Sequence, residues 1–202
     1  ANNLTKAGAS TLTLSGTNTY TGTTTVTGGT LSVSADSNLG NTTGALTLNG
    51  GNLTVTGAAT IDNTVTLSAN ATVTNSANVT LSGVISGANN LTKAGASTLT
   101  LTGTNTYTGT TTVTDGTLSV SADSNLGNTT GALTLNGGNL AITGATTIDN
   151  AVALSSNATV TNSANATLSG VISGANNLTK AGASTLTLSG TSTYTGTTTV
   201  NA

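Results

Sequence analysis

The chain of 202 residues contains no Cys, Pro, Met, Trp, Phe or His, and only 4% of its residues are charged. The absence of Cys excludes a scaffold held together by disulfides. With three Lys and no Arg, the chain has no basic patch that could neutralise phosphates, so we expect no nucleic-acid binding. No apolar run approaches the ~18 residues of a membrane-spanning helix, so we expect no direct membrane insertion of this segment.

The residues that are present form a pattern typical of an ordered β-protein. Disordered chains combine low hydrophobicity with high net charge, whereas this chain is 35% hydrophobic and its net charge is −2. Its apolar residues alternate with Thr or Ser, and this alternation indicates strands with one buried face. The side chains that we predict to point inward are those of Leu12, Leu14, Leu46, Leu48, Val65 and Leu67.

An 87-residue repeat organises the whole sequence. The same stretch of fourteen residues begins at Ala1, Ala88 and Ala175, and residues 1–87 match residues 88–174 at 78 of 87 positions. We therefore divide the chain into copy 1 (1–87), copy 2 (88–174) and a partial copy 3 (175–202) of one continuous solenoid. Because the terminal repeats of solenoids are normally distinct polar caps, and neither end resembles one, we expect a segment of a longer array.

Each copy contains about eleven short strand-like segments separated by Gly, Asn and Ser. Period-two alternation bounded by turn formers predicts strands, and no segment has the spacing of a helix. We predict an all-β fold, a right-handed parallel β-helix (β-solenoid) with three short strands per turn and about four turns of roughly 22 residues per repeat. A tandem immunoglobulin-like sandwich is the rival, but it requires longer strands and a large buried aromatic residue.

One stretch of each copy resembles a known family. Leu12–Leu31, LTLSGTNTYTGTTTVTGGTL, resembles the autotransporter-associated β-strand repeat, which is the passenger-domain repeat of type V secreted adhesins. Asn3–Lys6 and Ala35–Leu53 continue the pattern, which recurs at Leu99–Leu118 and begins again at Leu186. The resemblance implies export through a C-terminal outer-membrane barrel and a passenger that folds outside the cell as a β-helical stalk.

We expect no enzymatic activity, no cofactor, no metal and no catalytic or binding residue that can be named from the sequence. Without His, Cys, Glu or Arg, acid–base chemistry would depend on Asp and Lys alone. The calcium-binding repeat Gly-Gly-x-Gly-x-Asp is absent. We expect the carboxylates to form Asx-turns, although two of them, Asp36 and Asp62, could approach each other across turns. The five are Asp36, Asp62, Asp115, Asp123 and Asp149.

The Lys and Tyr residues each recur once per copy. We expect Lys6, Lys93 and Lys180 to be solvated and to discourage pairing at sheet edges. Tyr20, Tyr107 and Tyr194 are expected in packing or turn positions, with regularly spaced ligand contacts as the alternative. Asn-x-Thr triplets are frequent, as chance predicts in this composition, and they leave glycosylation open.

These observations favour a structural or adhesive extracellular stalk or fibre segment of a repetitive bacterial surface protein, attached to the outer membrane or released. The alternative is a self-assembling extracellular filament subunit, and a remote third is an ice-binding β-solenoid. The Thr-rich run at 17–27 recurs only once per 87 residues, which argues against a regular ice-binding lattice. The partners that we expect are neighbouring repeats, other copies in end-to-end or lateral contact, and a surface ligand of unknown identity.

Overall fold

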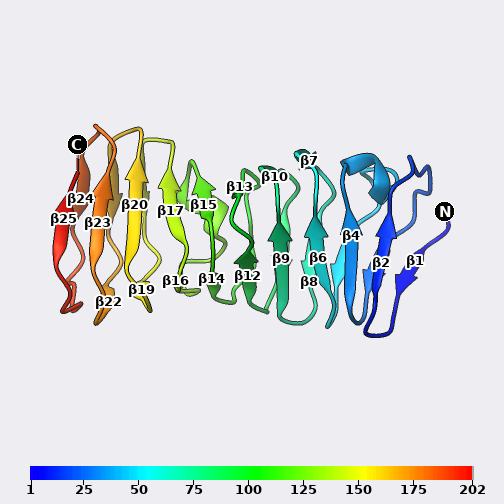
Figure 1. Cartoon of the computed structure of the whole chain (residues 1–202), viewed down its shortest axis with the longest axis horizontal. Helices are drawn as coiled ribbons and strands as arrows, with labels where there is room; N and C mark the ends of the chain where they lie inside the picture. Colours follow the sequence, from blue (N-terminus) through cyan, green and yellow to red (C-terminus); the bar gives the residue numbers. More distant parts are fainter. Residues whose placement is uncertain (202) are drawn as a thin grey trace.

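The computed structural model describes residues 1–201, which form an elongated three-sided β-solenoid of about ten turns (Figure 1). Every strand pair is parallel, and the strands stack along the long axis from the N-terminal end to the C-terminal end. Thr, Val, Leu and Ile dominate the strands because β-branched and aliphatic side chains suit a pleated surface that is buried on one side. The predicted all-β parallel solenoid is confirmed.

The strands form four sheets. Sheet A contains β1 (Leu4–Lys6), β3 (Thr24–Val26), β5 (Leu46–Leu48), β8 (Val65–Leu67) and β11 (Ile85–Gly87). Sheet B contains β2 (Thr11–Leu14), β4 (Thr30–Val33), β6 (Asn52–Val55), β9 (Ala71–Asn75), β12 (Leu91–Ala94), β14 (Thr111–Val113), β16 (Leu133–Leu135), β19 (Val152–Leu154) and β22 (Ile172–Gly174). Sheet C contains β7 (Ala59–Ile61), β10 (Val79–Leu81), β13 (Thr98–Leu101), β15 (Thr117–Val120), β17 (Asn139–Ile142), β20 (Ala158–Asn162), β23 (Leu178–Ala181) and β25 (Thr198–Val200). Sheet D contains β18 (Thr146–Ile148), β21 (Ala166–Leu168) and β24 (Leu186–Leu188).

Sheets A and D belong to the same side of the solenoid. Residues 104–108 form no strand but continue the side of sheet A, because Thr106 and Thr108 donate backbone hydrogen bonds to Ile85 and Gly87 of β11. On the next turn a short helix at residues 123–126 lies over this segment, and β18 of sheet D lies over the helix. The three sides are therefore sheets A and D, sheet B, and sheet C.

Two 3₁₀ helices interrupt the strands, and the sequence analysis did not anticipate them. They are η1 (Asp36–Leu39) and η2 (Asp123–Leu126), each followed by a glycine with positive φ. Both arise from the segment Ala-Asp-Ser-Asn-Leu-Gly, in which Asn38 or Asn125 accepts backbone hydrogen bonds from the residues just before the helix. An acidic residue at the start and Gly at the end are ordinary helix signals, and they could have revealed these elements.

Residues that pair on neighbouring turns lie 19–22 residues apart in the sequence. The prediction of three strands per turn and about four turns per copy is confirmed. The strand pairing also shows how far each copy extends beyond four whole turns. The first strand of each copy lies on a different side: β1 in sheet A, β12 in sheet B and β23 in sheet C. Each 87-residue copy thus makes four turns plus one side, and successive copies are rotated by one third of a turn.

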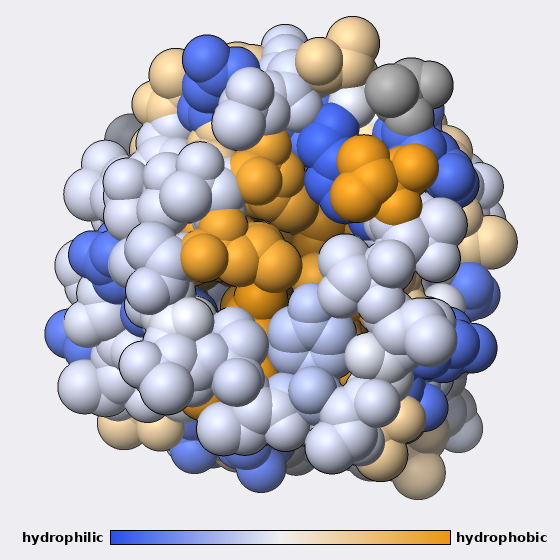
Figure 2. All heavy atoms as spheres, turned by 90° about the vertical axis from the view of Figure 1, so that its left-hand side faces the viewer, coloured by the Kyte–Doolittle hydropathy of each residue, from blue (hydrophilic) through white to orange (hydrophobic). Residues whose placement is uncertain are grey.

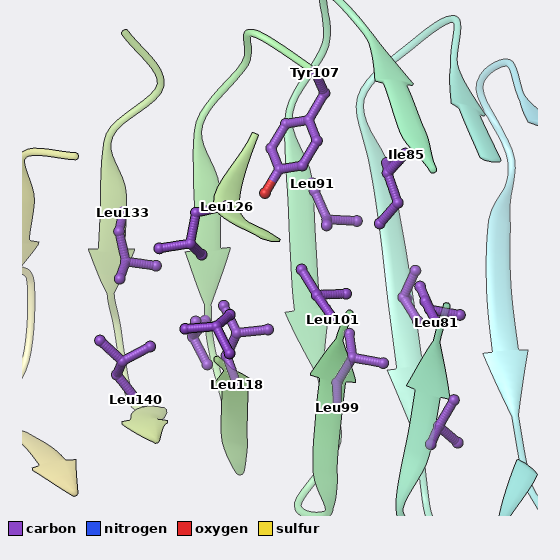
Figure 3. Close-up of a cluster of buried hydrophobic side chains, with 14 of the residues drawn as sticks. Leu81, Ile85, Leu91, Leu99, Leu101, Tyr107, Leu118, Leu126, Leu133 and Leu140 are labelled. Atoms are coloured by element: carbon purple, nitrogen blue, oxygen red, sulfur yellow. The ribbon is translucent and has the colours of Figure 1, made fainter. Parts of the chain in front are cut away.

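Leu, Val and Ile side chains fill the interior in continuous stacks (Figure 3). Four of the six side chains predicted to point inward are at most 2% exposed: Leu46, Leu48, Val65 and Leu67. The other two, Leu12 and Leu14, pack against the core but are only half-buried, because β2 is the first strand of sheet B and has a single neighbour. The inward orientation predicted from the alternation is therefore confirmed.

Candidate functional site

The described part of the chain, residues 1–201, contains no pocket and no group of three or more His, Cys, Asp or Glu residues placed to hold a metal ion. None of its helices is long and apolar enough to cross a membrane. The candidate functional features are therefore the corners, the outer faces and the two ends of the solenoid.

The lysines do not lie where the sequence analysis placed them. Lys6 and Lys93 occupy inward-facing positions and are 6% and 0% exposed, so the expectation of solvated lysines at sheet edges is wrong for both. The ammonium of Lys6 reaches the corner after β1 and donates to the carbonyl oxygens of Ala7 (2.8 Å), Gly8 (2.7 Å) and Gly28 (2.9 Å). A buried ammonium needs such partners, and the positive φ of Gly8 forms the corner that supplies them.

Copy 2 repeats this corner with one change in its electrostatics. Lys93 donates to the carbonyl oxygens of Ala94 (3.0 Å) and Gly95 (2.5 Å), and Asp115 stands where copy 1 has Gly28. Burial lowers the pKa of Lys93 to about 8, and the attraction of Asp115 opposes this shift only in part. The lysine corner thus closes a turn from inside the solenoid, and its charge does not contribute to the outer surface.

The tyrosines pack at corners, as one of the two expectations proposed. Tyr107 is fully buried, and its hydroxyl lies 2.6 Å from the Thr111 Oγ1 atom. Burial raises the pKa of Tyr107 to about 12. Gly127 covers the ring: a Cβ atom there would lie 2.5 Å from the Tyr107 carbonyl oxygen and 3.0 Å from the ring. Tyr20 and Tyr194 make the same hydroxyl contact, to Thr24 and Thr198, at the two ends of the solenoid.

Four of the five aspartates approach each other across turns in two pairs, as foreseen for Asp36 and Asp62. The Asp36 Oδ1 atom accepts a hydrogen bond from the Asp62 backbone N–H at 3.2 Å, and the Asp123–Asp149 pair repeats it at 2.9 Å. Burial is the main cause of a raised pKa at Asp36, and repulsion from the Asp62 carboxylate adds to it. The expected Asx-turn is wrong for Asp36 and Asp123, because their carboxylates bond to the next turn.

Asparagine makes the local turns and also links the corners. Asn41 and Asn128 accept from the backbone N–H two residues later, which is the Asx-turn expected of Asp. A second set, which the sequence analysis missed, accepts the backbone N–H of the residue 20 positions later on the next turn. Its members are Asn3, Asn52, Asn70, Asn78, Asn90, Asn139, Asn157, Asn165 and Asn177. The available signal was a spacing of about one turn between each Asn and the residue that donates its backbone N–H.

Hydroxyl columns run along the outer faces. In sheet A, pairing aligns one outward residue from each strand: Thr5, Thr25, Thr47, Thr66 and Ser86. Threonine therefore recurs on almost every turn of this side. The argument that the Thr-rich run recurs only once per 87 residues is thus wrong as evidence against a single column of threonines. A double column is broken, because the Thr-x-Thr of β2 and β9 alternates in sheet B with Thr-x-Ser in β4, Asn-x-Thr in β6 and Thr-x-Ala in β12.

A continuous stack of parallel turns defines a repetitive β-solenoid. Comparison with family models then identifies the repeat: the passenger-associated-transport-repeat matches residues 4–33, 91–120 and 178–202. The predicted passenger-type repeat is thus confirmed. Each full match spans the lysine corner, the tyrosine corner and four strands, whereas η1 and η2 lie outside the matched residues. No curated protein and no solved structure matches the chain.

The match also supports the coarser part of the functional prediction. Passenger-associated repeats are those of autotransporter passenger domains, which are secreted or cell-surface proteins. The chain accordingly carries repeats of the kind found in such surface proteins.

Proposed function

We propose that the chain is a structural and adhesive stalk or fibre segment that extends from the surface of a bacterium. The observation that carries this proposal is the unbroken solenoid of about ten turns, which bears three passenger-type repeats and has no pocket in residues 1–201. At ~4.8 Å per turn, each 87-residue copy would add about 21 Å of length. A stalk needs this regular extension, and its outer faces remain available for contacts.

The outer faces favour adhesion through many weak polar contacts. The outward side chains of the strands are mainly Thr, Ser, Asn and Ala, and the buried lysines leave the faces almost without positive charge. Hydroxyl and amide groups donate and accept hydrogen bonds, so they suit a polar uncharged partner on a host or bacterial surface. Repetition then adds the contacts of successive turns.

Two measurements test the two parts of this proposal. Solution scattering of variants with one or two additional 87-residue copies should show the length growing by about 21 Å per copy. A length that stays constant would contradict the stalk.

For adhesion, beads coated with the chain should bind host or bacterial cells, and a variant with Thr5, Thr25, Thr47 and Thr66 replaced by Ala should bind more weakly. Ala153 already occupies the position of Thr66 in copy 2, so we expect the variant to fold. Equal binding of the two beads would remove the hydroxyl column from the proposal.

A filament subunit is the second candidate, and the net charge of −2 favours it because long-range repulsion between copies is weak. Light scattering at increasing concentration tests this candidate, since a filament subunit should grow with concentration whereas a simple stalk segment should stay monomeric.

A further inference from the structure

Two corners of the solenoid combine an exposed Asn with a following glycine. Asn-Gly occurs only twice in the sequence, at Asn49-Gly50 and at the equivalent Asn136-Gly137 of copy 2. Each pair directly follows a strand, β5 or β16, and both Asn residues are exposed. Seen from the C-terminal end, the turns have an apolar centre that is surrounded by hydrophilic residues (Figure 2). The side chains at these two corners therefore lie in contact with water.

The fold explains the glycines of this corner. Gly50 and Gly137 have φ values of 93° and 106°, at which any side chain would be strained. The next residue must also be glycine, because a Cβ atom at Gly51 would lie 2.3 Å from the Val26 Cγ1 atom. The corner thus places a sterically unhindered backbone nitrogen directly after the exposed Asn.

The fold does not explain the Asn side chain. Asn49 donates its backbone N–H to the Val26 carbonyl oxygen at 2.8 Å, a bond that any residue except Pro could make. Among the hydrogen bonds of residues 1–201, none involves the Asn49 carboxamide or the Gly50 N–H, and the same holds for the equivalent residues of copy 2. Other exposed Asn residues differ: Asn70 and Asn157 accept a backbone N–H from the next turn, which holds their carboxamides in place.

A third corner shows how closely such a side chain approaches the following nitrogen. Asp115 also precedes a glycine with positive φ, Gly116, and its Oδ1 atom accepts the Gly116 N–H at 2.7 Å. The Cγ atom of Asp115 therefore lies beside that nitrogen. A carboxylate resists attack by a nitrogen because it is negatively charged, whereas the carboxamide of Asn is neutral. An Asn side chain at such a corner is thus both within reach of the nitrogen and open to attack.

We propose that Asn49 and Asn136 are sites of spontaneous modification, in which the backbone nitrogen of the following glycine attacks the side-chain Cγ atom. The nitrogen loses its proton and bonds to Cγ, the bond between Cγ and Nδ2 breaks, and ammonia leaves. A cyclic imide remains. Water, the only co-reactant, then opens this ring at either carbonyl carbon and leaves an aspartate or an isoaspartate. No atom is oxidised or reduced in either step.

The modification changes the charge of the two corners. Each event replaces a neutral carboxamide by a carboxylate, so two events would change the net charge from −2 to −4. The corner after β5 joins sheets A and B, whereas the corner after β16 joins sheets B and C. The new charges would therefore lie at different edges of the solenoid. An outer surface with few charges would become more negative as the chain ages.

Mass spectrometry of the folded chain, stored at mildly alkaline pH in water enriched in heavy oxygen, tests this proposal. Opening of the imide incorporates a heavy oxygen atom from water at the modified residue, and fragmentation of the chain locates it. We expect modification about ten times faster at Asn49 and Asn136 than at Asn70 and Asn157, where the next residue carries a Cβ atom and the carboxamide is held.

A matched variant, Asn49→Gln combined with Asn136→Gln, keeps two neutral carboxamides but requires a larger ring for the same attack. Isoelectric focusing of stored samples should show acidic species that accumulate far more slowly in this variant than in the original chain. Equal rates at Asn49 and Asn70, or modification that occurs only after unfolding in urea, would overturn the proposal. Either result would leave the stalk and filament candidates unchanged, since neither depends on this chemistry.

Discussion

Two regions of this molecule have nearly the same sequence and different surroundings. Residues 1–20 and 88–107 differ only at Ser15 and Thr102. In the middle of the chain, Leu99, Leu101 and Tyr107 are 0% exposed, whereas their equivalents in the first turn are only partly buried. The burial of a residue in a solenoid thus depends on the turns above and below it, which is the reason why repeat stability resides largely in the interfaces between neighbours.

The comparison predicts its largest effect for truncation of the same leucine in the two regions. Leu101→Ala should lower the free energy of unfolding by about 4 kcal/mol, because it leaves a cavity in a close-packed interior. Leu14→Ala should lower it by about 1 kcal/mol, since Leu14 is only partly buried and its surroundings can collapse. Urea titrations followed by circular dichroism measure both. Equal losses would mean that the end turn is as well packed as the middle.

The pH dependence of stability should carry the signature of the buried middle copy. Between pH 8 and 10.5 the unfolded chain holds a proton on Lys93 that the folded chain has lost, so stability should rise with pH, by at most about 3 kcal/mol. Tyr107 acts in the opposite direction. Its pKa is raised from 10.0 to about 12, so the stability that it contributes is complete below pH 10 and is lost as the pH rises towards 12.

A maximum of stability near pH 10 is therefore expected in thermal or urea unfolding across this range. Lys93→Met should remove the rise below the maximum, and Tyr107→Phe should remove the fall above it. Stability that declines steadily from pH 7 would show that the Lys93 ammonium is better stabilised by its carbonyl partners than its burial suggests.

A smaller effect is expected at an asparagine that copy 3 has replaced. Asn105 accepts from the Ile85 backbone N–H (2.7 Å) and donates to the Asn125 carbonyl oxygen (2.6 Å), whereas Asn18 in the first turn makes only the equivalent second bond. Asn105→Ser should lower the free energy of unfolding by about 2 kcal/mol, because it leaves a buried N–H unpaired. Asn18→Ser should lower it by about 1 kcal/mol. A loss that is the same at both positions would show that the bond to Ile85 adds nothing.

On the outer faces, equivalent substitutions in the two regions should have the same effect on the free energy of unfolding. Thr13 and Thr100 are equivalent outward residues of β2 and β13, and neither contributes to the interior. Thr13→Ala and Thr100→Ala should each change the free energy of unfolding by less than about 0.5 kcal/mol. A larger loss at Thr100 alone, measured in the same urea titrations, would mean that outward hydroxyl groups stabilise the middle of the stack from outside.

Much of the fold followed from local pattern. Alternation at Leu46–Leu48 and Val65–Leu67 predicted inward side chains because a parallel stack buries one face of every strand. The eleven strands per copy likewise follow from regularly placed Gly and Asn. The lysines were misplaced because an inward Lys is unfavourable unless carbonyl groups surround its ammonium, and only the three-dimensional corner at Ala7 and Gly8 provides them.

Other features depend on relations between turns that no local pattern contains. The Asn3 side chain bonds to the backbone of Thr23, and Asp36 bonds to that of Asp62, because the solenoid brings residues one turn apart into contact. The number of turns per copy could be predicted only to the nearest whole turn. The additional third depends on whether each turn takes 19, 20 or 22 residues, and small shifts in corner length decide this.

Because of that additional third of a turn, the number of repeats determines the rotation about the long axis between the first copy and the last. Inserting one copy would advance everything beyond it by about 21 Å and would also swing it through 120° around the long axis. Two inserted copies would turn the residues that follow towards the third side, and three would return them to their original orientation at a greater distance along the axis. A change in the number of copies therefore changes the orientation of the residues that follow without altering a contact within a turn.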